Sequence, residues 1–133
     1  VVLASAAGPG FVEFVERDQT DGDEVTLLAK RLLAPVKDAG VDALLLGCTH
    51  YPYLAPVIQR VMGEGVVLVS SANETAFAVR ELLESQGLAA AVGAQARRRF
   101  LSSGDVDVFA SLGRRLLGPE LRDVAAWHSG AAS

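Results

Sequence analysis

The sequence is short of the residues that several common kinds of protein depend on. It has one cysteine and two histidines in 133 residues. One cysteine cannot form an internal disulfide, so nothing points to an oxidising compartment, and a reduced thiol is consistent with the cytoplasm. A structural zinc module is disfavoured as well, because such modules need paired cysteine or histidine ligands at regular spacing. We therefore expect no metal and no disulfide framework.

Long apolar runs and an excess of positive charge are also missing. No stretch approaches the roughly 18 to 20 apolar residues that cross a bilayer, and no basic leader is visible, so we expect neither a membrane-spanning nor a secreted chain. The formal net charge of −4 and a pI of about 5.1 argue against nucleic acid as a partner. The arginines at 97–99 and 114–115 are interpreted as solvated faces or protein contacts.

Aliphatic residues, in contrast, are plentiful. Half of the residues are hydrophobic and the mean hydropathy is +0.31, which is apolar for a domain of this length. Helical and strand-like stretches alternate with short connections, which is typical of an α/β protein with a parallel sheet. The apolar excess fits strands buried on both faces, and it also fits a chain whose natural neighbour is missing.

Apolar periodicity and capping residues predict where the elements lie. We expect helices over residues 11–17, 22–39, 54–62, 71–87 and 106–117, with Asp21, Ser71 and the 103–105 segment as start signals. In the helix after Ser71 we expect Ala76, Val79, Leu82 and Leu83 to face inward. Strands are expected over residues 1–5, 41–46, 66–69 and 98–101, an extended segment over 121–127, a connector over 88–95 and a frayed tail over 129–133.

One predicted strand leads directly to the most reactive residues of the chain. Cys48, Thr49 and His50 follow residues 41–46, and ligands bind at the carboxyl ends of strands in open α/β sheets. A following helix N-terminus and the nearby imidazole both favour the thiolate form of Cys48. Such a thiol suits proton transfer. A cysteine hydrolase is the weaker alternative, since side chains two residues apart around a turn need not face each other.

Residues 47–52, with the sequence glycine-cysteine-threonine-histidine-tyrosine-proline, resemble the second catalytic motif of glutamate racemases. Four further segments resemble segments of that family in the same order, namely residues 11–16, 68–76, 99–105 and 112–118. The resemblance covers nearly the whole chain. It implies a flavodoxin-like lobe with a parallel sheet, and an isomerase that interconverts L- and D-glutamate without a cofactor and supplies D-glutamate for peptidoglycan.

The resemblance also implies roles for individual residues. Cys48 would be one of two facing cysteines, the one that deprotonates L-glutamate, and His50 would assist it. Thr49 would bind the substrate, and Glu16 matches a family glutamate near the site. From the residues alone, Thr49 as a turn hydroxyl and Glu16 as a solvated carboxylate stay open, while Tyr51 is expected to shape the turn.

Members of this family are about twice as long, and the segments of their first half that carry the other catalytic cysteine do not occur here. We therefore expect a carboxyl-terminal half, with residues 1–70 in the second lobe and residues 71–133 returning to complete the first. Such a half is expected to be inactive alone and to pair with the absent amino-terminal half, and a homodimer also stays open. The alternatives are a racemase for aspartate and a non-catalytic module.

Overall fold

The protein is described from a computed structural model that covers residues 3–128, so the predicted tail at 129–133 lies outside the described residues. The chain divides into two compact units, Val1–Ala89 and Ala90–Ser133. The division at residue 70 that we predicted concerns the lobes of a longer protein, and it stays a prediction.

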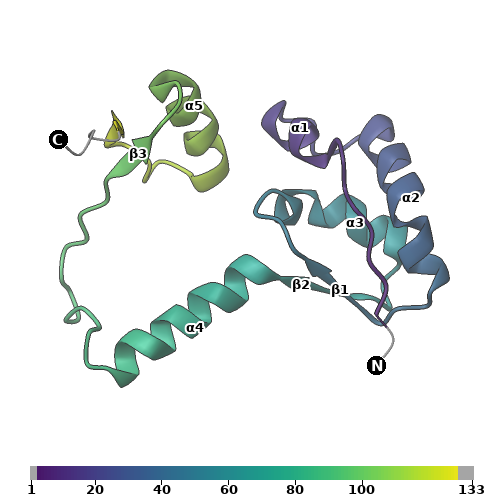
Figure 1. Ribbon diagram of the computed structural model, residues 1–133, viewed down its shortest axis with the longest axis horizontal. Coiled ribbons are helices and arrows are strands. Elements are labelled where there is room, and N and C mark those ends of the chain that lie inside the picture. The colour runs from purple at the N-terminus through teal and green to yellow at the C-terminus, as the bar shows by residue number, and fades with distance from the viewer. Residues whose placement is uncertain (1–2, 129–133) are drawn as a thin grey trace. The chain divides into compact units, whose positions relative to one another are not determined.

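The first unit is built on two parallel strands, β1 (Ala43–Leu46) and β2 (Val67–Ser70). Ala43 lies opposite Val67 and Leu46 opposite Ser70. Two helices, α2 (Asp23–Asp38) and α3 (Ala55–Met62), lie side by side against this sheet (Figure 1). Both strands were predicted, and so was their parallel pairing, because short aliphatic runs alternate with amphipathic helices.

The core of this unit consists of the predicted apolar stripes of the two helices. The short helix α1 (Phe11–Glu16) adds Phe11 and Val15 to it. Full burial of one large aliphatic side chain stabilises a fold by about 1.5–3 kcal/mol, so these stripes hold the unit together. The buried positions of α2, η1 (Tyr51–Leu54) and α3 are Val25, Ala29, Leu33, Val36, Leu54, Val57, Ile58, Val61 and Met62.

The sheet is covered on one face only, and the prediction that its strands are buried on both faces is wrong for the described residues. Leu46 is 4% exposed, whereas Leu45 and Val67 are each 63% exposed. Successive side chains of a strand point to opposite faces, and α2 and α3 pack on the face of Leu46. The opposite face stays bare because no described helix packs on it.

The strand predicted over residues 1–5 is also wrong where the structure describes it. Residues 3–5 have no strand conformation. They line a cavity whose opposite wall is β1, so their backbone lies too far from that strand to pair with it.

Helix α4 (Ser71–Ser85) forms as predicted, but its apolar residues do not face inward. None of its residues is buried, including Ala76, Val79, Leu82 and Leu83. Phe77, which lies on the same helix, is 60% exposed. Apolar spacing identified the helix correctly, whereas it could not say whether a partner for that face is present.

Two of the three predicted helix starts use a different residue. The N-cap of α2 is Gly22 and that of α4 is Ser70, and neither makes a side-chain cap. The Ser71 hydroxyl donates instead to the carbonyl of Leu46 at 3.0 Å. Asp21 accepts a hydrogen bond from the Gly22 N–H and another from Arg60, and these bonds place the pKa of its carboxyl below the ordinary value.

The second unit also contains two parallel strands with a helix between them in sequence. Strands β3 (Phe100–Ser102) and β4 (Val124–Ala126) pair in parallel, and α5 (Val106–Leu117) lies between them in sequence. Asp105 caps α5 as predicted, accepting hydrogen bonds from two backbone N–H groups at 2.9 Å. No helix in residues 3–128 is both long and apolar enough to cross a bilayer.

Candidate active site

The Cys48 turn follows β1 directly and is held by its own backbone. The Tyr51 N–H donates to the Cys48 carbonyl at 3.2 Å, and the Tyr53 N–H donates to the His50 carbonyl at 3.1 Å. These bonds open η1, a single 3₁₀ turn that leads into α3. Cys48 is a free, half-buried cysteine. The short strand and the tight turn thus fix the direction in which the thiol-bearing backbone leaves the sheet.

Tyr51 ties this turn to the loop before α1. Its hydroxyl donates to the Gly8 carbonyl at 3.3 Å, and its ring packs edge-to-face on Phe11 with centroids 5.4 Å apart. A Cβ at Gly8 would lie 2.5 Å from the Tyr51 hydroxyl oxygen, so a glycine is required at this position. The predicted role of Tyr51, shaping the turn, agrees with these contacts.

His50 and Glu16, which are far apart in the sequence, come together at this turn. The Nε2 atom of His50 lies 3.6 Å from a carboxylate oxygen of Glu16, an electrostatic contact that is too long for a good hydrogen bond. The Nδ1 atom of His50 lies 3.5 Å from the Thr49 hydroxyl. When Nε2 carries the proton and faces the carboxylate, Nδ1 becomes an acceptor for that hydroxyl. The imidazole is thus held between two other candidate residues.

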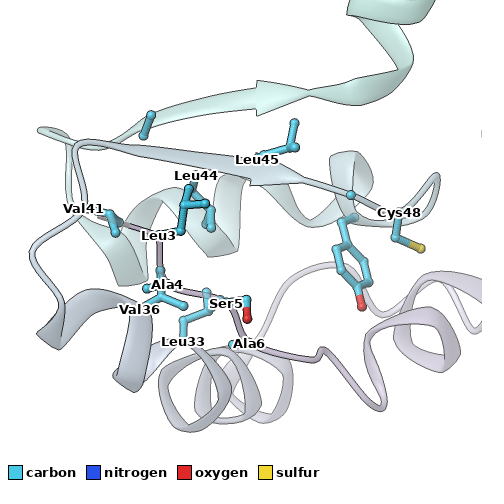
Figure 2. Close-up of a pocket in the computed structure, with 13 residues that line it drawn as sticks. Leu3, Ala4, Ser5, Ala6, Leu33, Val36, Val41, Leu44, Leu45 and Cys48 are labelled. Atoms are coloured by element: carbon cyan, nitrogen blue, oxygen red, sulfur yellow. The ribbon is translucent and has the colours of Figure 1, made fainter. Parts of the chain in front are cut away.

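A cavity of about 520 Å³ runs along β1, and Cys48 lies at one end of it (Figure 2). The sulfur is therefore not sealed inside packed side chains. The wall carries no cationic side chain, and its polar side chains are those of Ser5, Cys48 and Tyr51. A dicarboxylate needs charged or multiple hydrogen-bond donors when it leaves water, so this cavity is not suited to hold glutamate.

The four predicted site residues therefore lie in one region of the first unit, on the Cys48 turn and on the facing helix α1. Their catalytic and binding roles stay predictions. Sequence reasoning did not foresee the Gly8 contact or the Ser71 bond to Leu46. The glycine-proline-glycine run at 8–10 was a signal for a tight turn, but not for its partner. Within residues 3–128, no cluster of three or more metal-ligating side chains is present.

Comparison with known proteins gives a consistent picture. No model of a protein family matches the sequence. A glutamate racemase of Acidothermus cellulolyticus is 50% identical over 125 residues, which are 93% of this chain and 48% of the relative. A solved glutamate racemase of Bacillus anthracis is 34% identical with a TM-score of 0.84, over 92% of this chain and 46% of that one. One from Francisella tularensis, solved with D-glutamate, is 27% identical with a TM-score of 0.80, over 90% and 44%.

These likenesses define an α/β protein with the parallel-sheet fold of an amino-acid racemase, as predicted. Over 93% of its length the chain is similar to a glutamate racemase, which confirms the resemblance seen in residues 47–52. The chain spans about half the length of the curated relatives that it matches.

Proposed function

We propose that Cys48 is one of the two proton-transfer groups of a glutamate racemase and that this chain supplies one face of such an enzyme. The observation that carries the proposal is an accessible thiol at the carboxyl end of a parallel strand, beside the contact of His50 with Glu16. The identity of 50% to a racemase supports the substrate and the reaction.

Racemisation removes a proton from one face of the α-carbon and returns one to the other face, so a single base cannot complete it. The Cys48 thiolate would accept the α-proton of L-glutamate, forming an S–H bond while the C–H electron pair stays on carbon. A second thiol, from outside this chain, would then donate its proton to the opposite face. Hydrogen-bond donors and the substrate ammonium would stabilise the carbanion in between, and the scheme uses no cofactor.

The other candidate residues have supporting roles in this scheme. The Thr49 hydroxyl and backbone would bind the substrate. His50 would exchange protons with Cys48 or orient it, while the Glu16 carboxylate holds the far side of the imidazole. The chemistry requires a reduced thiol, which the cytoplasm maintains. There the product would serve peptidoglycan synthesis.

We further infer that the chain is inactive until another racemase segment joins it, the amino-terminal part that it does not span. Helix α4 has no buried residue, and Phe77 and Leu82 are 60% and 54% exposed. Apolar faces of this kind mark an interaction surface.

Mixing experiments test the proposal. The chain is combined with the amino-terminal part of the Acidothermus cellulolyticus racemase, and D-glutamate formation and deuterium uptake at the α-carbon are measured. We expect no turnover from the chain alone and turnover from the mixture. Cys48→Ser should lower that turnover about a thousandfold or more, because serine is a far weaker proton acceptor.

Circular dichroism of the Cys48→Ser chain controls for loss of fold. Equal turnover by the serine variant would refute the role of Cys48. Faster formation of D-aspartate than of D-glutamate would instead assign the enzyme to the aspartate racemases.

A further inference from the structure

Helix α2 carries apolar side chains outside the face that packs in the core. Leu27 and Leu28 follow the buried Val25, and Leu27 is 70% exposed. Successive residues of a helix are turned by about 100°, so Leu27 points away from the core and Leu28 lies at its flank. Leu28 is half-buried because it leans toward the loop before α1, where a Cβ added at Gly10 would lie 3.1 Å from it. The outer side of α2 therefore presents apolar surface that the unit leaves open.

An open hollow of about 420 Å³ lies over these two leucines. Its wall consists of Glu24, Leu27, Leu28 and Arg31 of α2 together with Phe14 of α1. Residues three, four and seven positions apart share one face of a helix, so the four α2 side chains form a single row. The hollow is thus apolar in the middle, with a carboxylate at one end and a guanidinium at the other.

The two charges at the ends of the hollow are exposed, and within residues 3–128 neither of them forms an ion pair. Glu24 and Arg31 are seven residues apart, which separates them by about 10 Å along the axis, whereas ion pairs on one helix form at three or four residues. A protein seated on this face must therefore offer a cation opposite Glu24, an anion opposite Arg31 and apolar side chains between them.

A second copy of α2 meets this description. The midpoint between residues 24 and 31 falls between Leu27 and Leu28. When two copies of α2 lie antiparallel with a twofold axis at this midpoint, Glu24 of each copy faces Arg31 of the other. The leucines of the two copies then pack against each other at the axis. Twofold interfaces are built from such self-complementary patches.

We propose that the outer face of α2, made of Glu24, Leu27, Leu28 and Arg31, docks a second copy of the chain as an antiparallel, twofold-symmetric pair of helices. Phe14 of each copy closes the side of the hollow. The inference goes beyond the proposed function and does not depend on it, because it uses no residue of the Cys48 turn. One helix face gives a small contact, so we expect a weak dimer, in the class of interfaces that bury less than about 1,200 Å².

Single charge reversals test the pairing of the two ends. Sedimentation of the complete chain is measured from about 1 to 1,000 µM, which spans the range of weak affinities. Glu24→Arg sets arginine opposite Arg31, and Arg31→Glu sets glutamate opposite Glu24, twice in each dimer. Each reversal should raise the dimer Kd at least tenfold, because like charges then meet. Lys30→Glu is the matched control, since this exposed residue of α2 lies outside the hollow.

A mixture of the two reversed chains gives the sharpest result. Where a Glu24→Arg chain meets an Arg31→Glu chain, arginine faces glutamate at both ends. We expect the mixed dimer to form with about the affinity of the unchanged chain, although each variant alone is weakened. A loss of fold or a general effect of net charge cannot produce this rescue.

A polar substitution in the middle of the face tests the apolar contact. Leu27→Ser should also raise the dimer Kd about tenfold, because the leucine is removed from the centre of the contact. The variant should stay folded, as circular dichroism can verify, since Leu27 is 70% exposed in the single chain.

The possible outcomes separate this inference from its competitors. An unchanged chain that stays monomeric at about 1 mM would overturn it. Dimers that survive both reversals would place the contact elsewhere, at α4 or at the edge of β1, and would overturn it too. So would reversals that leave self-association unchanged but weaken binding of the amino-terminal part of the Acidothermus cellulolyticus racemase. None of these results bears on Cys48, whose role is tested by turnover.

Discussion

The imidazole of His50 depends on neighbours that come from different parts of the chain. Glu16 approaches its Nε2 atom from α1, and Thr49 approaches its Nδ1 atom from the same turn. Both contacts are long and partly exposed, so each adds less than about 1 kcal/mol to stability. We therefore expect these contacts to matter for the orientation of the ring rather than for the stability of the fold.

Replacing Glu16 with glutamine tests this orientation. Glu16→Gln should lower kcat/KM of the assembled racemase about tenfold, because the ring loses the charged acceptor that fixes it. Glu13→Gln is the matched control, since Glu13 lies on the same helix and is exposed. Steady-state kinetics and thermal unfolding of both variants are compared. Equal activity of the two variants would argue that Glu16 is only a solvated carboxylate.

Gly8 is a second position where one residue controls the turn. An added Cβ would lie 2.5 Å from the Tyr51 hydroxyl oxygen and 2.7 Å from the Phe11 ring, so both rings must move. Gly8→Ala should lower the free energy of unfolding by about 1–3 kcal/mol, as is usual for overpacking. Gly65→Ala, where nothing lies within 4 Å, should have a much smaller effect. Denaturant unfolding of both variants measures the difference.

Among the elements, the residue Asp21, which lies just before α2, forms an exposed ion pair with Arg60 of α3. The Gly22 N–H and then Arg60 lower the pKa of the Asp21 carboxyl. A carboxyl whose pKa is lowered by folding stabilises the fold above its unfolded pKa, and this stabilisation is lost as the pH falls through the folded value. Asp21→Asn should therefore lower the unfolding midpoint slightly at pH 7. The unfolding midpoints of the two proteins should converge as the pH falls below about 4. An equal difference between the midpoints at every pH would contradict the assignment.

Helix α5 offers a cleaner test of a local signal. The Asp105 carboxylate caps it through two backbone N–H groups, those of Asp107 and Val108. Asp105→Ala should reduce the free energy of unfolding by about 0.5–2 kcal/mol, whereas Asp105→Asn should retain most of the cap. Calorimetric unfolding of the two variants checks this, and equal losses would indicate that charge matters more than the cap.

Elements were predictable from the sequence where the information is local. Periodicity predicted the apolar stripes of α2 and α3 and the aliphatic strands. This works because side chains that pack in a core within one unit recur at the period of their helix or strand. The start signals at Asp21 and Ser71 failed because the same side chains found other partners, Arg60 and the Leu46 carbonyl. The approach of Glu16 to His50 is a tertiary contact that no local pattern encodes, and only the family resemblance nominated Glu16.

For the whole molecule, the apolar surface of α4 leads to a prediction about assembly. Phe77→Ser should weaken binding of the amino-terminal racemase segment about tenfold or more, since a large side chain that could be buried is removed. The stability of the chain alone should change little, because Phe77 is 60% exposed. Glu81→Ser, on the same exposed helix, is the control. Titration calorimetry measures both, and equal affinities would exclude this face from the interface.

Within the described residues β1 pairs with β2 on one edge only, and its other edge is a hazard while it stays unpaired. A short aliphatic strand with free backbone groups is a template for adhesion between identical molecules. One face of its sheet is uncovered as well, so exposed apolar side chains such as Leu45 adjoin the unpaired edge. Pairing of this edge with a further strand would then keep copies of the chain apart as well as extend its sheet.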